Sequence, residues 1–314
     1  MKEPDSSDIS ITDLIKRNID LKAYSRWKIG GKADYFSEPK NHIQLLKTLE
    51  YAKLNSLPYQ ILGDATNILF DDDGYRGIII RIGHNLNRCE IKESKIFVEA
   101  GHWIPCLAKK TADHHLSGLE HTVGIPGTLG GLIYMNGGSN RNSISSNILA
   151  VHAIDENLNE VILTNSECGF SYRKSIFQRN KYIIIKALLQ LQHKSKAVIR
   201  EEMLSILANR KKKFPLKEPN CGSVFTRNTE LYNKFGPPGK IIEDLGLKGY
   251  RIGGAVVSNV HANFIVNDGN ATAREVVQLV KKINTLIFSK TNKLLKSEIR
   301  YLSPQGTFKF MHEL

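Results

Sequence analysis

A glycine-rich run between Gly118 and Gly138 is the part of this sequence best suited to binding a ligand. Seven glycines and one proline fall within its 21 residues. Glycine is entropically costly inside a helix or a central strand, so we expect neither there. Such backbone can instead approach a ligand closely and point N–H groups at anionic oxygens. The run is therefore a candidate phosphate-binding segment.

The same run has a second interpretation, a turn-rich connection between strands, because glycine and proline commonly mark turns. Two features favour ligand binding over this alternative. The glycines are unevenly spaced, unlike those of a linker. They also alternate with Ile125, Leu129, Leu132 and Ile133, which need a core in which to be buried.

A basic run at residues 210–213, followed by Lys217, is a second candidate ligand contact. The net charge of +13 suits either a nucleic-acid binder or an enzyme of phosphorylated ligands. No aromatic residues alternate with these basic residues to stack on bases, so we expect no nucleic-acid partner. A solvated helix face and the steering of a diphosphate-bearing small molecule both remain open.

The length and composition of the chain limit the classes of protein to which it can belong. At 314 residues the chain exceeds one typical core, so we expect two or three subdomains. The first ten residues are polar, and no stretch approaches the roughly 18 apolar residues of a membrane span. The four cysteines are far apart and form no Cys-x-x-Cys pair, which argues against a disulfide framework or a metal site. We expect a cytoplasmic protein without a membrane partner.

Helical and strand patterns alternate along the first two thirds of the chain. Ile43, Leu46, Leu49 and Ala52 share one helical face, and apolar runs before and after the polar turn at 71–74 predict neighbouring strands. The expected helices are 41–55, 104–114 and 197–210, and the expected strands are 59–62, 77–80, 96–100, 150–154 and 182–191.

The last hundred residues form a further α and β unit. We expect a short helix at 240–245 and strands at 262–266 and 298–302. Asn270 could cap a longer helix with one apolar stripe. That stripe consists of Val276, Leu279, Val280, Ile283, Leu286 and Ile287. The fold class is α+β with several subdomains.

Eight short motifs follow one another along the chain, and each is weak alone but specific in this order. They lie at residues 28–33, 62–69, 118–131, 172–175, 221–225, 240–243, 261–267 and 297–299. Together they resemble the UDP-N-acetylenolpyruvoylglucosamine reductase (UDP-N-acetylmuramate dehydrogenase) family, flavoenzymes of peptidoglycan precursor synthesis, over about residues 25–304. The short interval between Tyr172-Arg173 and the strand at Tyr182 is similar to the family's shorter form, which lacks a substrate-capping insertion.

The resemblance implies a two-subdomain FAD-binding fold of the vanillyl-alcohol-oxidase/p-cresol-methylhydroxylase type, followed by a C-terminal α+β substrate-binding domain. The expected segments are an N-terminal extension (1–24), FAD-binding subdomains (25–85 and 86–194), a helix and basic linker (195–220), the substrate-binding domain (221–304) and a tail (305–314).

The implied cofactor is FAD, with NADPH as the hydride-donating cosubstrate. Backbone amides of two stretches would hold the flavin diphosphate, and no Gly-x-Gly-x-x-Gly fingerprint follows a strand. The implied cofactor-binding residues are Gly63, Asp64, Ala65, Thr66, Asn67, Ile68, Gly124, Ile125, Pro126, Gly127, Thr128, Gly130, Gly131 and Asn136.

The implied catalytic residues are Arg173, Ser223 and Glu298. The family reduces an enolpyruvyl ether, in which hydride addition spreads negative charge over a carbon and its carboxylate. The planar fork of Arg173 suits that carboxylate. Ser223 matches the family's proton donor, and Glu298 matches a glutamate that helps to stabilise or protonate the intermediate. If Glu298 acts as an acid, its pKa should be raised by burial or a neighbouring carboxylate.

The substrate contacts implied at this point are Lys213, Lys217, His261 and Asn263. The two lysines would meet the UDP diphosphate or the phosphates of NADPH. His261 and Asn263 share a motif that would lie near the flavin or the substrate, although a lone histidine in a strand is more often structural. The partners expected are a UDP-sugar and NADPH, and the chain is expected to be a monomer.

Some positions depart from the family pattern. Asp64-Ala65 stands where the family usually has two glycines, and residues 136–140 replace a more usual Asn-Ala-Gly-aromatic stretch. An aspartate would repel a bound diphosphate unless its side chain pointed away. These departures leave open a paralogue acting on a related enolpyruvyl or lactyl sugar nucleotide, and a catalytically silent flavin-binding protein.

Overall fold

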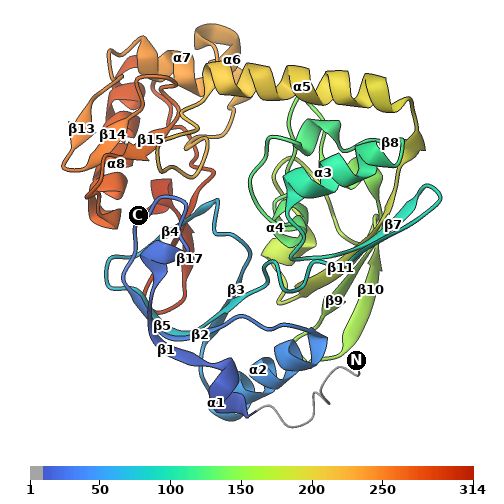
Figure 1. Cartoon of the computed structure of the whole chain (residues 1–314). Helices are drawn as coiled ribbons and strands as arrows, with labels where there is room; N and C mark the ends of the chain where they lie inside the picture. Colours follow the sequence, from blue (N-terminus) through green and yellow to red (C-terminus); the bar gives the residue numbers. More distant parts are fainter. Residues whose placement is uncertain (1–9) are drawn as a thin grey trace. The chain divides into compact units, whose positions relative to one another are not determined.

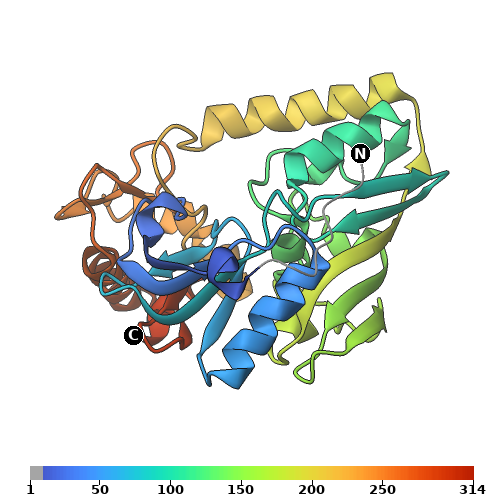
Figure 2. The same ribbon diagram turned by 60° about the horizontal axis from the view of Figure 1, so that its bottom comes forward.

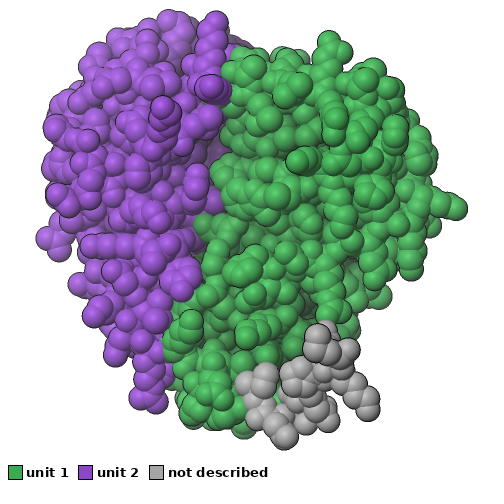
Figure 3. Space-filling view, viewed as in Figure 1, with its two compact units in different colours: residues 1–16, 36–64, 79–210 green, residues 17–35, 65–78, 211–314 purple. Residues whose placement is uncertain are grey.

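A computed structural model describes residues 10–314 (Figure 1). The chain forms two compact units, coloured in Figure 3. Of the described residues, unit 1 comprises 10–16, 36–64 and 79–210, and unit 2 comprises 17–35, 65–78 and 211–314. Each unit is built from separated stretches of the chain. The bounds of the six consecutive segments expected from the sequence stay predictions.

Unit 1 contains an antiparallel five-stranded sheet in the order β10-β9-β11-β7-β6. Its strands are β6 (Cys89–Lys92), β7 (Lys95–Glu99), β9 (Ile148–Ile154), β10 (Glu160–Thr164) and β11 (Ile183–Gln190). One face is buried, with Val98, Val151 and Ala187 each at most 1% exposed. The short helix α4 (Leu129–Tyr134) contacts β7 and β11. The glycine-rich run is thereby held against this sheet.

The other helices of unit 1 are α1 (Ile11–Leu14), α2 (His42–Leu54), α3 (Ile104–Asp113) and most of α5 (Lys196–Lys213). Asn41 caps α2 by accepting the Gln44 N–H at 2.9 Å. The long helix α5 runs along α3 (Figure 2), and Asp113 of α3 pairs with Lys196 at 3.0 Å and with Arg200 at 2.7 Å. These contacts fix the N-terminal end of α5, and the basic run forms its other end.

Short strands complete unit 1. β3 (Tyr59–Leu62) neighbours the end of β5 (Tyr75–Arg81), as expected for the two apolar runs, and the Ile82 N–H donates to the Leu62 carbonyl at 2.8 Å. β8 (Leu116–Ser117) pairs with β12 (Gln192–His193). β8 ends at the start of the glycine-rich run, so the sheet and these pairs anchor both flanks of that run.

Unit 2 gathers several small sheets around helix α8 (Ala273–Thr291). Strands β1 (Lys16–Asp20), β2 (Lys32–Ser37) and β5 are successive neighbours. β4 (Ile68–Phe70) runs parallel to β16 (Arg300–Leu302), which pairs with β17 (Phe308–Phe310). β13 (Arg251–Ile252), β14 (Ala255–Val257) and β15 (Ile265–Asn267) form a third sheet. α6 (Thr229–Phe235) and α7 (Pro238–Glu243) precede it.

The core of unit 2 forms along the expected apolar stripe of α8. Val276, Leu279 and Ile283 are fully buried, whereas Leu286 is partly buried against the same cluster. Trp27 is also fully buried, and its indole N–H donates to the Ile265 carbonyl at 2.8 Å. A buried indole needs such a partner, because an unpaired N–H is costly to desolvate.

Several expected elements differ from those observed. The expectation that the glycine-rich run holds no helix is wrong, because α4 forms inside it. Gly130 and Gly131 lie in the first turn of α4, where Thr128 supplies the N-cap and accepts the Gly131 N–H. Thr128 thus offsets the poor helix propensity of the two glycines.

The C-terminal helix begins at Ala273 rather than just after Asn270. Thr272 is its N-cap, in a capping box with Glu275, and the Asp72 carboxylate accepts the N–H groups of Ala273 and Arg274 at 2.7 and 3.1 Å. The local Thr272-x-x-Glu275 signature, which the sequence prediction overlooked, and the tertiary contact from Asp72 together set this boundary.

Other elements keep their type but change their bounds. α5 extends through the basic run to Lys213, and α7 begins at Pro238. β15 and β16 start at Ile265 and Arg300, later than expected. No helix in residues 10–314 is both long and apolar enough to cross a membrane.

We predict that Asp72→Ala lowers the free energy of unfolding by about 1–2 kcal/mol, because two N–H groups at the start of α8 lose their acceptor. Urea denaturation measures the change. Asp73→Ala is the matched control, since this exposed neighbour in the same turn caps no helix. Equal losses in the two variants would contradict the assignment.

Candidate functional site

Two of the predicted cofactor-binding stretches meet in unit 1, where Gly63 faces Thr128. A Cβ on Gly63 would lie 2.2 Å from the Thr128 Oγ1, so only glycine fits without displacing that side chain. The same Oγ1 accepts the Gly131 N–H at 3.4 Å. The structure therefore brings Gly63, Thr128 and Gly131 together, as a shared diphosphate site requires.

Several backbone amides near this contact have no acceptor within the described residues. They belong to Asp64, Gly124, Gly127 and Thr128. By contrast, the amides of Leu129 and Gly130 donate to the carbonyls of His102 and Ala100 at 2.9 and 2.8 Å. Unsatisfied N–H groups in a glycine-lined turn suit an anion. These residues fit the diphosphate of FAD.

Arg210 of α5 lies against Gly124. A Cβ on Gly124 would come within 2.2 Å of the Arg210 Cδ, so the missing side chain makes room for the arginine. Burial lowers the pKa of the Arg210 guanidinium from its ordinary value. The following lysines, Lys211 to Lys213, are exposed. The first residue of the basic run thus reaches the glycine-rich turn.

Asp64, the acidic residue that departs from the family pattern, is paired. Its Oδ1 accepts a hydrogen bond from the Arg81 Nη2 at 2.7 Å, while the Arg81 Nη1 donates to the Glu38 Oε1, also at 2.7 Å. Burial alone would lower the pKa of the Arg81 guanidinium. The two hydrogen-bonded carboxylates raise that pKa by more than burial lowers it, so the net shift is upward. The Asp64 charge is thus largely compensated within the protein.

Ala65, the second departure, adopts φ of +46°. The left-handed region costs a non-glycine residue about 1–2 kcal/mol, so the turn retains the backbone conformation that glycine would take freely. In unit 2 the Ala65 carbonyl lies 3.8 Å from the Sγ of the buried Cys221.

The rest of the first cofactor stretch belongs to unit 2 and is tied to the Glu298 segment. The Asn67 Nδ2 donates to the Glu298 carbonyl at 3.2 Å, and the Arg300 N–H donates to the Asn67 carbonyl at the same distance. Ile68 begins β4 and is the partner of Arg300 in the parallel pair. Thr66 is half-buried between these anchored residues.

Arg173, the predicted carboxylate ligand, lies beside the tail of the glycine-rich run in unit 1. Its backbone has φ of +57°, and its Nη2 donates to the Gly138 carbonyl at 3.5 Å. Asn136 supports the same turn, because its Nδ2 donates to the Ser171 carbonyl at 2.9 Å. Asn136 is thus engaged by the protein, and a direct flavin contact from it stays a prediction.

Ser223 and Glu298 lie on adjoining segments of unit 2. The Glu298 N–H donates to the Val224 carbonyl at 2.8 Å, and Phe225 forms an isolated antiparallel bridge with Ser297. The Ser223 and Glu298 residues are both half-buried. This pairing brings together two of the three predicted catalytic residues from positions 75 residues apart in the sequence.

Asn263 holds the segment that carries Ser223. Its Oδ1 accepts the Phe225 N–H and its Nδ2 donates to the Phe225 carbonyl, both at 2.9 Å, while its own carbonyl accepts the Val224 N–H at 2.8 Å. Asn263 is 6% exposed. These bonds make it a positioning residue, and the substrate contact predicted for it stays a prediction.

His261 packs in an aromatic cluster, with ring centroids 5.5 Å from Phe214 and 5.1 Å from Phe264. Its Nδ1 accepts the Asn263 N–H at 3.1 Å, so the proton of the neutral ring lies on Nε2. Burial lowers the pKa of His261. These contacts favour the structural interpretation, and substrate binding by His261 stays a prediction.

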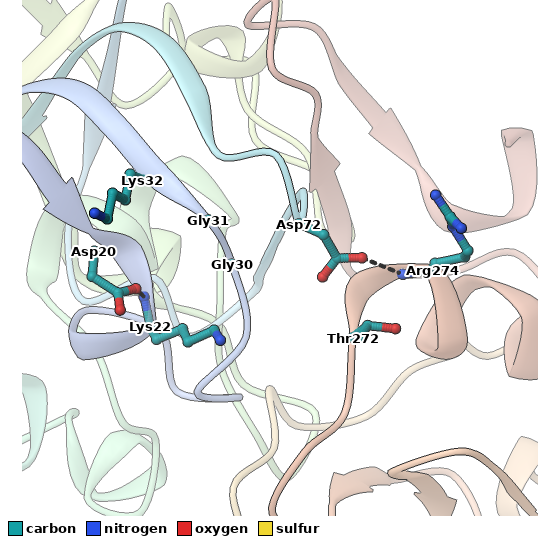
Figure 4. A pocket seen from close by; sticks show the side chains of 8 residues that line it. All are labelled: Asp20, Lys22, Gly30, Gly31, Lys32, Asp72, Thr272 and Arg274. Carbon is teal, nitrogen blue, oxygen red and sulfur yellow. Dashed lines mark hydrogen bonds between the residues drawn. The ribbon is translucent and has the colours of Figure 1, made fainter.

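Lys213 and Lys217 are exposed, as a phosphate-steering role allows. A separate pocket of about 510 Å³ in unit 2 contains none of the predicted site residues (Figure 4). Its charged lining mixes Asp20 and Asp72 with Lys22, Lys32 and Arg274. Asp72 is already bound to the backbone of α8, as the dashed line in Figure 4 marks. We therefore do not assign the candidate cofactor site to this pocket, and the glycine-lined turn stays the candidate.

Sequence reasoning missed Arg81 and included Arg210 only as part of the basic run. Arg81 is the last residue of β5, so no local pattern separates it from a solvated residue. The one available signal for Arg81 was indirect, since an aspartate in a diphosphate-binding turn needs a nearby cation.

Comparison with known proteins extends these observations to the whole chain. The sequence profile of the UDP-N-acetylenolpyruvoylglucosamine reductase C-terminal domain matches residues 214–302, and that of an FAD-binding domain matches residues 33–162. UDP-N-acetylenolpyruvoylglucosamine reductase 1 of Corynebacterium glutamicum is 38% identical over 94% of this chain and 88% of its own length. The Protochlamydia amoebophila reductase is 39% identical over 94% and 96%, respectively.

The chain belongs to the UDP-N-acetylenolpyruvoylglucosamine reductase family.

The crystal structure of the Thermus caldophilus reductase agrees, with a TM-score of 0.78 at 28% identity over 91% of this chain and 98% of that one. The resemblance and the α+β class, with an FAD-binding domain and the family's C-terminal domain, are confirmed. The protein is thus an oxidoreductase of a flavin-binding family. The individual roles of its site residues stay predictions.

We predict that Gly63→Ala lowers the free energy of unfolding by about 1–3 kcal/mol, because the new Cβ collides with the Thr128 hydroxyl. Thr128→Ala costs about 1 kcal/mol through loss of the α4 cap. The double variant should lose less than the sum, since the shortened side chain at position 128 leaves room for the added Cβ. Urea denaturation of all four proteins measures the coupling, and strictly additive losses would refute the contact.

Proposed function

We propose that this protein reduces UDP-N-acetylglucosamine enolpyruvate to UDP-N-acetylmuramate with NADPH, using bound FAD, in peptidoglycan precursor synthesis. Membership of the reductase family over nearly the whole chain supports the reaction class. The observation that carries the proposal is the pairing in unit 2 that keeps Ser223 and Glu298 on adjoining segments. That arrangement suits a proton donor and an acid acting on one carbon.

FAD binds, in this proposal, through the glycine-lined turn of unit 1. The amides of Asp64, Gly124, Gly127 and Thr128 receive its diphosphate oxygens, and the Asp64–Arg81 pair keeps the acidic side chain from repelling them. When bound, FAD supplies hydride transfer, which no side chain of the protein can perform. The protein's own residues orient the substrate, stabilise charge and deliver a proton.

Arg173 binds the substrate carboxylate. A guanidinium offers two parallel N–H donors to a carboxylate and stabilises the charge that builds up there after hydride addition. The positive φ of Arg173 and the Gly138 contact hold its backbone and side chain in a defined position. A residue fixed in this way needs no rearrangement as charge develops, which is the basis of electrostatic catalysis.

Ser223 delivers the proton from its hydroxyl to the carbon next to the carboxylate, and Glu298 stabilises or protonates the same intermediate. A hydroxyl is a weak acid, so it needs a strongly basic carbon and a fixed position. The Asn263 bonds to Phe225 and Val224 provide that fixed position. Lys213 and Lys217 attract the diphosphate of the UDP-sugar or the phosphates of NADPH.

The alternative function is a paralogue that acts on a related enolpyruvyl or lactyl sugar nucleotide. The unusual residues 136–140 favour it, because they lie next to the Arg173 turn. Asp64 does not favour it, since Arg81 compensates its charge. Turnover of the two substrate classes by the same preparation separates the two functions.

We predict that the purified protein is yellow, bleaches when NADPH is added without oxygen, and recovers its colour with UDP-N-acetylglucosamine enolpyruvate. Absorbance near the flavin's visible band follows both steps. A colourless protein that FAD cannot reconstitute would refute the flavoenzyme function. Bleaching without recovery on the enolpyruvyl substrate would support a silent flavin-binding protein or the paralogue.

We predict that Ser223→Ala leaves flavin reduction by NADPH nearly unchanged but slows reoxidation by the enolpyruvyl substrate by about 100-fold or more, the usual scale for a lost general acid. Stopped-flow absorbance separates the half-reactions. Thr226→Ala is the control, because its hydroxyl lies three residues away and donates to the Lys296 carbonyl. Equal slowing of both half-reactions in Ser223→Ala would indicate a folding role.

A further inference from the structure

Residues 308–314, the C-terminal segment, pack against the core of unit 2. β17 pairs with β16, and the chain then forms a 3₁₀ turn at Met311–Glu313 that contacts α8. Met311 is fully buried among the residues of that core. The neighbouring His312 is therefore held in a defined position.

His312 makes a hydrogen bond to the backbone next to Glu298. Its Nδ1 accepts the Ser297 N–H at 2.9 Å. An accepting Nδ1 carries no proton, so the proton of the neutral ring lies on Nε2. The ring also packs against Phe310, with ring centroids 5.6 Å apart. Ser297 is 2% exposed, and its N–H would be costly to leave unpaired at such a position.

The Ser297 N–H is not part of the pairing that joins the Glu298 segment to the Ser223 segment. In that pairing, which is antiparallel, the Glu298 N–H donates to the Val224 carbonyl at 2.8 Å. Successive N–H groups of an extended chain point to opposite sides, so the preceding N–H points away from Val224. The backbone at Glu298 is thus bonded to the Ser223 segment on one side and to His312 on the other.

Burial and charge keep the His312 ring able to accept this bond at neutral pH. Burial lowers the pKa of His312, Glu313 opposes this shift and Lys296 adds to it, so the net shift is downward. A protonated ring would carry a hydrogen on Nδ1 and could not accept the Ser297 N–H. The neutral ring is therefore the form that supports the backbone.

We propose that His312 is a positioning residue for Glu298, holding the backbone of Glu298 against the Ser223 segment through its bond to the Ser297 N–H. The inference rests on the proposed function, in which Ser223 and Glu298 act on one carbon. In this role His312 acts through the backbone rather than by touching the substrate. Loss of the bond frees one side of the Glu298 segment, and a catalytic group that is displaced by a fraction of its working distance loses rate.

Two substitutions of similar shape separate the hydrogen bond from the packing of the ring. In His312→Asn, the amide Oδ1 can take the place of Nδ1 and accept the Ser297 N–H. In His312→Leu, a methyl group takes that place and cannot accept. His312→Phe is a second variant without an acceptor, and it keeps an aromatic ring beside Phe310.

Ser303→Ala is the matched control for the loss of one acceptor. The Ser303 Oγ accepts the Thr307 N–H at 3.0 Å in the turn between β16 and β17. This bond supports the same C-terminal segment as the His312 bond does, but it does not involve the Glu298 backbone. Its loss should therefore leave both half-reactions unchanged.

Stopped-flow absorbance of each purified holoenzyme follows the two half-reactions separately. We expect His312→Leu and His312→Phe to slow flavin reoxidation by the enolpyruvyl substrate about tenfold, the scale of a modest displacement of a catalytic group. Flavin reduction by NADPH should stay within about twofold of the wild type, because Glu298 acts only in reoxidation. His312→Asn should keep at least about a third of the wild-type reoxidation rate, since it restores the acceptor.

Hydrogen exchange of the Ser297 amide, followed by NMR, tests the bond without turnover. We expect exchange to be about tenfold faster in His312→Leu, the scale of one lost hydrogen bond. In His312→Asn the exchange should be close to that of the wild type. Unchanged exchange in His312→Leu would show that the bond does not protect this amide and would overturn the inference.

Three kinetic results would also overturn the inference. They are wild-type reoxidation in His312→Leu and His312→Phe, a loss in His312→Asn as large as that in His312→Leu, and equal slowing of both half-reactions. The second would assign the effect to the ring, and the third would indicate a general structural role. If His312→Leu does not fold, His312→Phe decides, and failure of both to fold would likewise indicate a structural role.

Failure of the proposed function gives a different result. A wild-type protein whose reduced flavin is not reoxidised by the enolpyruvyl substrate would refute that function, and the positioning role of His312 with it. The exchange of the Ser297 amide would still report the bond in that case. A wild type that turns over, with an unaffected His312→Leu variant, would refute the positioning role alone.

Discussion

The contact between Gly63 and Thr128 is the constraint on which the candidate cofactor site depends. Because a Cβ at Gly63 would collide with the Thr128 hydroxyl, the two stretches approach as closely as backbone and side chain allow. The same hydroxyl caps α4, so helix formation and the close approach are coupled through one atom. Without the cap, the two glycines that open α4 would disfavour a helix, and the turn preceding it would lose its support.

Asp64 directly follows Gly63, so its negative charge lies next to the candidate cofactor turn. An acidic residue at position 64 would oppose a diphosphate, yet it is held by Arg81, which Glu38 restrains from the other side. A half-buried network of this kind contributes little net stability, because desolvation offsets much of the attraction. Its consequence is that the Asp64 carboxylate is held in one position and its negative charge is compensated by Arg81. The chain therefore carries an aspartate at position 64 whose charge is compensated locally and an alanine at position 65 that keeps a left-handed backbone.

The sequence predicted the strongly periodic elements well, because the spacing of apolar residues along a helix or strand is a local property of the sequence. α2, α3, β3 and β11 lie within a few residues of their expected bounds, and the α8 stripe is the core of unit 2. The two helix starts that were missed have different causes. The start of α8 is fixed by the local capping box of Thr272 and Glu275 together with Asp72, 201 residues away. At α4, local capping by Thr128 permits a helix that the glycine content argued against. The motif order supplied the predicted site residues, but Arg81 had no local signature, and only the fold relates it to Asp64.

The Ser223 segment of unit 2 and the glycine-rich run of unit 1 are supported by different kinds of interaction. In unit 2, Asn263 bonds the backbone of Phe225 with both ends of its amide, so the Ser223 segment is held by one buried side chain. In unit 1, by contrast, Glu120 and His121 each commit one atom to Gly118 and leave another unpaired in a buried position. An amide bonded at both ends fixes the backbone beside it, whereas an unpaired buried acceptor leaves its desolvation cost uncompensated within the described residues.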